Sequence, residues 1–257
     1  MVTIVVSTAN AILAKCDRTF RVGVLGDEPL FFSDKSRTKQ GSIVDILDEL
    51  RKRTGCSFQV VEMSRPTLLD RVRNSTVDMT VLSIKTPVMD SAAGGFIEMF
   101  RSYRAIVMTP ELGLKNYDLK KALHDKKVVF SGIIGSPGHL NVDEFKLLKE
   151  ESRLQQFPDY ASVFQALKRK QVQVFVGSVA ISDYFLRKYD LTSFTFIIDR
   201  EKINGVGSYY SKSRLTTAEV QMLKMNYEQM LKDGFFATVY SKYTSPAAVK
   251  NAILPMN

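Results

Sequence analysis

The stretch Val77–Met89, with the sequence VDMTVLSIKTPVM, is the part of the chain that decides the fold. Its first six residues are mostly apolar, and this pattern predicts a buried strand. Ser83, Thr86 and Pro87 follow, and they indicate that the strand runs into a loop.

Outward from this stretch, strand-like and helix-like segments alternate, which predicts an α/β fold with mostly parallel sheets. Ser42 and Thr217 are expected to cap helices with their side-chain oxygens, and Gly132 and Gly135 to mark a bend after a strand. The predicted strands are 20–25, 57–63, 77–82, 103–108, 126–131, 172–177, 194–198 and 206–211, and the predicted helices are 43–54, 67–73, 119–124, 142–151, 161–170, 181–189 and 217–232.

Size and charge limit the class of protein. A chain of 257 residues that is 45% hydrophobic can build one large domain or two of about 100–150 residues. The net charge of +9 raises nucleic acid, an anionic membrane surface or an anionic small ligand as partners. The basic residues are scattered, in short groups such as 51–53 and 168–170 on helices that also carry an apolar face. We therefore interpret them as solvated helix faces and expect no nucleic-acid partner.

Residues 1–14, MVTIVVSTANAILA, contain no charged side chain and resemble the apolar core and cleavage region of a signal peptide. The basic n-region is missing, which leaves an N-terminal strand as the alternative. Fourteen residues fall short of the roughly 20 that span a bilayer as a helix, and Lys15 disfavours lipoprotein processing at Cys16. We expect a signal peptide and export to the periplasm.

The two cysteines support export. Cys16 lies just before the first predicted strand and Cys56 just after the first predicted helix. A helix that returns antiparallel to its strand ends near the start of that strand, so both sulfurs should reach the same edge of the sheet. A disulfide there would stabilise the fold by about 4 kcal/mol in the chain-entropy model, and it would persist in an oxidising compartment. The alternative is two separate buried thiols.

Several segments, taken in order, resemble the type II periplasmic solute-binding proteins of family 3, which serve ABC transporters for polar amino acids. The resemblance covers about residues 18–244. It rests on FRVGVLGDEPLFF (20–32), GSIVDI (41–46), SRPTLLDRVRNSTVDMTVLSIKTP (64–87), VVFSGIIGSPGHL (128–140), VFQALKRKQVQVFVGS (163–178) and VQMLKMNYEQMLKDGFFATVYSKY (220–243).

The resemblance implies two α/β lobes joined by two crossovers that close like a hinge over one small ligand. Lobe 1 would comprise 18–108 plus 205–257 and lobe 2 would comprise 109–204, with crossings near 109–112 and 199–205. It also implies a monomeric periplasmic protein that delivers a small polar or anionic ligand to an ABC permease. No cofactor is implied.

The charged groups that hold an amino acid in that family are replaced here. The family's arginine, which grips the ligand carboxylate, ends a Thr-x-x-Arg motif, whereas residues 86–89 end in Met89. The position of the family's ammonium-binding aspartate is Ser178. An unpaired charge buried in a cleft costs several kcal/mol, so an ordinary α-amino acid is not the expected ligand.

Arg65 or Arg104 could supply a displaced positive charge for an anion without an amine, or each could be a surface residue. Phe31 could form an aromatic wall of the cleft or pack in the core. Ser136 follows Gly135 before a helix, where backbone N–H groups can also face an anion. The expected ligand-binding residues are Asp27, Phe31, Arg65, Ser83, Thr86, Met89, Ser136 and Ser178.

Two other functions stay open. The same fold could serve as a ligand-sensing or partner-binding module, with a membrane sensor in place of the permease. A related branch contains cyclohexadienyl dehydratases, which need a carboxylate in the cleft. The matching segment here offers only Asp183, expected on a solvent face, and neither His124 nor His139 has a nucleophile or metal cluster beside it. We expect no enzyme activity and no metal.

Overall fold

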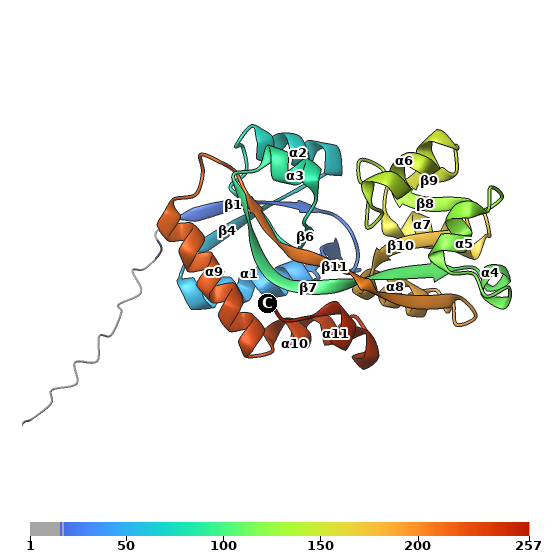
Figure 1. The fold of residues 1–257 in the computed structure, drawn as a ribbon. Helices are drawn as coiled ribbons and strands as arrows, with labels where there is room; N and C mark the ends of the chain where they lie inside the picture. Colours follow the sequence, from blue (N-terminus) through green and yellow to red (C-terminus); the bar gives the residue numbers. More distant parts are fainter. Residues whose placement is uncertain (1–15, 17, 257) are drawn as a thin grey trace, which may run out of the picture.

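The computed structural model describes residue 16 and residues 18–256. A nine-stranded mixed sheet forms its centre, in the order β4-β1-β5-β11-β7-β10-β8-β9, with β6 paired to β11 (Figure 1). The strands are β1 Thr19–Leu25, β2 Phe32–Ser33, β3 Lys39–Gln40, β4 Ser57–Met63, β5 Met79–Thr80, β6 Ser83–Ile84, β7 Gly95–Met108, β8 Phe130–Ile133, β9 Leu154–Phe157, β10 Val174–Ser178 and β11 Thr195–Tyr210.

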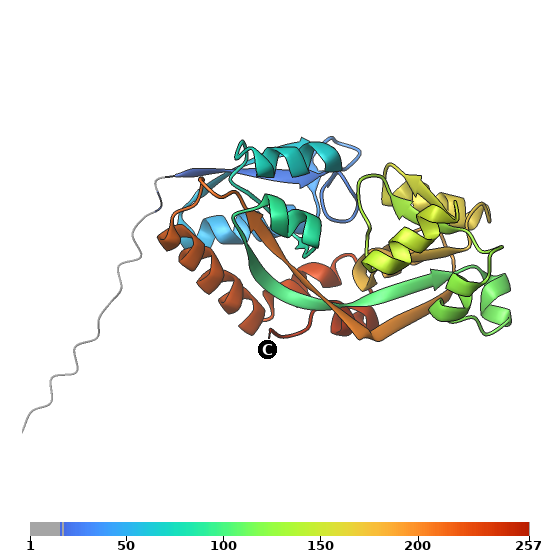
Figure 2. The ribbon, with the colours of Figure 1, turned by 45° about the horizontal axis from the view of Figure 1, so that its top comes forward.

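Two long antiparallel strands, β7 and β11, run through the whole molecule (Figure 2). On one side of this ribbon β1 pairs in parallel with β4 and β5, and on the other side β8 pairs in parallel with β9 and β10. The expected α/β fold with mostly parallel strands is therefore confirmed. Near its middle the ribbon is irregular, because β11 bulges between Asp199 and Ile203 opposite Arg104 and Tyr103.

The apolar side chains form separate cores at the two ends of this ribbon. We call lobe 1 the part built on the core that contains Phe20, Ile46 and Phe236, and lobe 2 the part built on the cores around Phe130 and Phe164. Along β7, Ala105 is the last residue that packs in the lobe 1 core, and Ile106 is the first that packs in a lobe 2 core. The lobe boundaries expected from the sequence stay a prediction.

Helices cover the sheet in both lobes (Figures 1 and 2). In lobe 1, α1, α9, α10 and α11 contribute to the main core, whereas α2 and α3 pack on a smaller cluster around Tyr209. The helices are α1 Ser42–Thr54, α2 Arg65–Arg73, α3 Pro87–Ala92, α4 Pro110–Leu114, α5 Leu119–His124, α6 Val142–Glu150, α7 Tyr160–Lys168, α8 Val179–Lys188, α9 Thr217–Lys232, α10 Phe235–Ser241 and α11 Pro246–Ala252.

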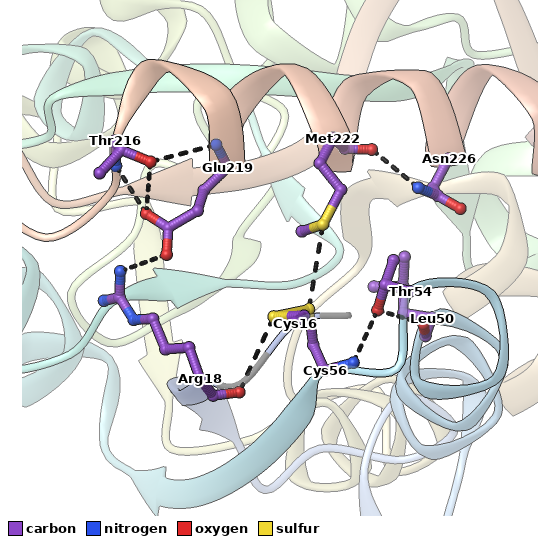
Figure 3. The surroundings of a disulfide bond; sticks show 9 residues. All are labelled: Cys16, Arg18, Leu50, Thr54, Cys56, Thr216, Glu219, Met222 and Asn226. Atoms are coloured by element: carbon purple, nitrogen blue, oxygen red, sulfur yellow. Dashed lines mark hydrogen bonds and ion pairs between the residues drawn. A yellow bond between two sulfur atoms is a disulfide. The ribbon is translucent and has the colours of Figure 1, made fainter. Parts of the chain in front are cut away.

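The predicted disulfide between Cys16 and Cys56 is confirmed, with a Cα–Cα distance of 4.7 Å. Figure 3 shows it beside Met222 of α9, whose sulfur lies 3.9 Å from the Cys56 sulfur. Arg18, two residues after Cys16, donates a hydrogen bond of 2.6 Å to Glu219 of the same helix. The start of the described chain is thus tied both to the end of α1 and to α9.

Two expected helix caps are wrong by one residue. α1 is preceded by Gly41, whose φ of 123° suits glycine, and Ser42 is its buried first residue. α9 is capped by Thr216, which forms a capping box with Glu219. The predicted signal peptide, 1–14, lies outside the described residues. Within residue 16 and residues 18–256, every helix is too short or too polar to cross a bilayer.

Candidate functional site

A cavity of about 170 Å³ lies between the two lobes. Lobe 1 contributes the end of β1, the start of α2 and the segment 81–89, and lobe 2 contributes the turn 135–139 and the starts of α7 and α8. Most of the lining side chains are apolar. The polar ones belong to Arg65, Ser83, Thr86, Ser102, Ser136, His139, Tyr160, Ser178 and Tyr240.

Arg65 is the one charged side chain among the described residues that line this cavity. It is the first residue of α2, a helix capped by Ser64, so its position is fixed by the helix start. Its Nη2 lies 3.5 Å from Oδ2 of Asp27. Its Nε is buried and has no partner among the described residues. The guanidinium therefore keeps donor capacity for a bound anion.

Asp27 pairs with Arg65 but does not line the cavity. The residue is only 7% exposed, and this burial raises the pKa of its carboxyl group, while the Arg65 charge opposes the rise. The backbone N–H of Tyr160, at the start of α7, also stabilises the carboxylate. Phe31 is 3% exposed and packs in the lobe 1 core, so it is a core residue and not an aromatic wall of the cleft.

Ser83, Thr86 and Met89, all predicted from the sequence, do line the cavity. The Ser83 hydroxyl donates to Thr80, so a ligand would meet its oxygen as an acceptor. Thr86 caps α3 by accepting from the Met89 backbone N–H, and its own N–H donates to the Tyr209 hydroxyl. Met89 places a thioether where a cation was expected from the family pattern, which leaves this side of the cavity apolar.

The lobe 2 residues Ser136 and Ser178 also line the cavity. Ser136 accepts a hydrogen bond from the Gly138 N–H in a turn. It lies in the turn before α6, which begins at Val142 behind its own cap, Asn141. Ser178 does stand at a helix start, where it caps α8 by accepting from the Ile181 N–H.

His139 is a cavity residue that sequence reasoning missed as a ligand contact. Its Nδ1 lies 3.1 Å from the side-chain nitrogen of Asn204. With that amide as donor, the ring proton resides on Nε2, which can donate in turn. Burial and the nearby charge of Arg104 lower the pKa of His139 to about 4. The ring is therefore neutral at pH 7.

Two further sequence interpretations are corrected by the structure. Arg104 is neither a surface residue nor a cavity residue: it is 4% exposed and binds Asp199 and Glu144. Asp183 does not face solvent. It is 8% exposed and accepts hydrogen bonds from the backbone and hydroxyl of Ser245, the cap of α11.

Comparisons with known proteins agree with this architecture. No protein-family model and no curated protein matches the sequence. An ancestral amino-acid-binding protein, described as a precursor of cyclohexadienyl dehydratase, aligns with a TM-score of 0.72 and 17% identity over 88% of this chain and 96% of that one. A solute receptor for L-cysteine from Neisseria gonorrhoeae aligns with a TM-score of 0.69 and 20% identity over 90% and 94%.

A substrate-binding protein of an ABC uptake transporter from Streptococcus pneumoniae, solved with bound histidine, aligns with a TM-score of 0.71 and 14% identity over 88% of this chain and 92% of that one. At such low identities the likeness establishes the fold. The chain has the two-lobed fold of ABC-transporter solute-binding proteins, and the fold expected from the sequence resemblance is confirmed.

Proposed function

We propose that the protein is an extracytoplasmic solute-binding protein that closes over a small polar or anionic ligand and delivers it to an ABC permease. The observation that carries this proposal is the cavity enclosed by both lobes, with Arg65 as the charged side chain in its wall. A ligand there contacts both lobes at once, so its binding energy favours the closed arrangement.

Two further observations support the proposal. The Cys16–Cys56 disulfide suits an oxidising compartment outside the cytoplasm. The bound amino acids of similar proteins show that this fold can enclose a molecule of that size. The absence of a carboxylate from the described cavity wall gives a dehydratase-type mechanism no acid group to use there.

Ligand binding can be tested by thermal shift and calorimetry against the twenty amino acids and a panel of small carboxylates, phosphate and sulfate. We expect carboxylates or other anions to raise the melting temperature and ordinary amino acids to give little or no shift. Replacement of Arg65 by Ala should weaken binding of the best anion by about 1.5–3 kcal/mol, the range for hydrogen bonds to charged groups.

Arg51→Ala is the matched control, because Arg51 lies on the solvent side of α1 and, among the described residues, pairs with the half-exposed Asp48. It should bind the same anion as the parent does. If no compound in the panel binds or shifts the melt, the proposed function is wrong.

A further inference from the structure

The balance of charge inside the cavity restricts the ligand further. Arg65 supplies one positive charge, and no Asp or Glu lines the cavity among the described residues. Three carboxylates outside the wall are paired with arginines: Asp27 with Arg65 itself, and Glu144 and Asp199 with Arg104. The Arg65–Asp27 pair is neutral overall, but its cationic member is the one at the wall, and the Arg65 Nε has no partner among the described residues. A ligand carboxylate therefore meets a guanidinium, whereas an ammonium group would meet no carboxylate on this wall.

Most of the other side chains in the wall are apolar, on both lobes. Leu25, Leu68 and Met89 line it from lobe 1 and Ile181 from α8, close to the start of the helix. Contact between these side chains and an apolar part of the ligand removes apolar surface from water, which favours binding. The same side chains cannot form hydrogen bonds with a second charged group. The cavity volume of about 170 Å³ suits a small ligand.

We propose that the ligand is a small monocarboxylate with an apolar body and no ammonium group, such as a branched-chain 2-oxo acid. This inference rests on the proposed function. Its carboxylate meets Arg65, and its carbon skeleton contacts the apolar wall. A neighbouring oxo or hydroxyl oxygen can accept hydrogen bonds from the hydroxyl of Tyr160 or from the Nε2–H of His139, which both line the cavity.

The test is calorimetry with three compounds that carry one carboxylate alone, a carboxylate with an ammonium group, or two carboxylates. 4-Methyl-2-oxopentanoate has the proposed character, leucine has the same carbon skeleton with an ammonium group, and glutarate replaces the apolar end by a second carboxylate. We expect the oxo acid to bind at least tenfold more tightly than either of the others. Arg65→Gln should weaken its binding at least tenfold, while Arg71→Gln, on an exposed position of the same helix, should leave it unchanged.

A gain-of-function variant tests whether a carboxylate in the wall reverses the ligand preference. Ser178→Asp keeps a good helix cap for α8 and adds a carboxylate to the cavity wall. It should weaken binding of the oxo acid and give measurable binding of leucine. If the parent protein binds leucine as tightly as the oxo acid, the ligand class is wrong and the proposed function stands. If the whole panel fails to bind, the proposed function falls as well.

Discussion

His139 is a single residue whose protonation the fold controls. Its folded-state pKa of about 4 lies below the value of about 6.5 in an unfolded chain. Above pH 6.5 the ring is neutral in both the folded and the unfolded state, so its protonation does not lower the free energy of unfolding. As the pH falls toward 4 the unfolded state takes up the proton first, so the folded state loses stability.

We therefore expect the parent to lose about 2 kcal/mol more unfolding free energy than His139→Gln when the pH is lowered from 7.0 to 4.5. Glutamine can still accept a hydrogen bond from Asn204, so the variant removes the titration and keeps the contact. Urea unfolding of both proteins at the two pH values measures the difference. Parallel losses in parent and variant would show that His139 is not responsible.

At the scale of elements, Arg104 joins three segments near the middle of the molecule. From β7 it donates through Nε and Nη2 to Asp199 of β11, at 2.9 and 2.7 Å, and through Nη1 to Glu144 of α6 at 2.9 Å. It also reaches the carbonyl oxygen of His139 at 3.3 Å. One buried guanidinium thus holds the bulge of β11, the start of α6 and the cavity turn together.

Arg104→Ala should reduce the free energy of unfolding by about 3–5 kcal/mol, because it leaves two largely buried carboxylates without a partner. Arg101→Ala is the control on the same strand. Arg101 is partly exposed and pairs with Glu98, so its loss should cost less than about 1 kcal/mol. Chemical denaturation compares the two, and a cost as small for Arg104 as for Arg101 would contradict the clamp.

Much of the fold follows from local pattern, and the rest depends on tertiary contacts. The long amphipathic α9 and the strand β4 have the bounds that the sequence predicts, 217–232 and 57–63. The short helices α10 and α11 were missed because seven residues carry little periodicity. The predicted strands 194–198 and 206–211 are two ends of β11, because the charged residues 200–202 between them form its bulge.

Much of the residue set that lines the cavity could also be predicted from the sequence. Six of the eight expected ligand residues line one cavity, which brings Arg65 and Ser178 together from different lobes. Whether they bind a ligand stays a prediction. Ser102, Tyr160 and Tyr240 were missed, because nothing in their local sequence distinguishes a cavity side chain from a core one.

For the whole molecule, Gly135 of lobe 2 faces Pro66 of lobe 1, so a larger residue at 135 should limit how closely the lobes approach. Gly135 has a φ of 75°, and a Cβ there would lie 3.2 Å from Cγ of Pro66. Gly135→Ala should therefore cost about 1–2 kcal/mol of stability for the left-handed backbone. It should also weaken binding of 4-methyl-2-oxopentanoate, since the lobes are held apart.

Gly234→Ala provides the control for backbone strain alone. Gly234 has the same φ of 75°, and nothing lies within 4 Å of a Cβ placed there. The two variants should lose similar amounts in thermal denaturation, and only Gly135→Ala should lose affinity in calorimetry. Equal affinity in both would show that the contact with Pro66 does not limit closure.

The two lobes also differ in how much of the chain their cores need. The buried residues of the lobe 2 cores all come from one stretch, 106–191, whereas the lobe 1 core joins residues as far apart as Phe20, Val179 and Phe236. During synthesis or passage through a membrane the N-terminal part emerges first. Cys16 and Cys56 can meet early and lobe 2 can fold next, while lobe 1 must wait for α9 and α10. Its unfinished sheet is the surface that a chaperone would need to protect.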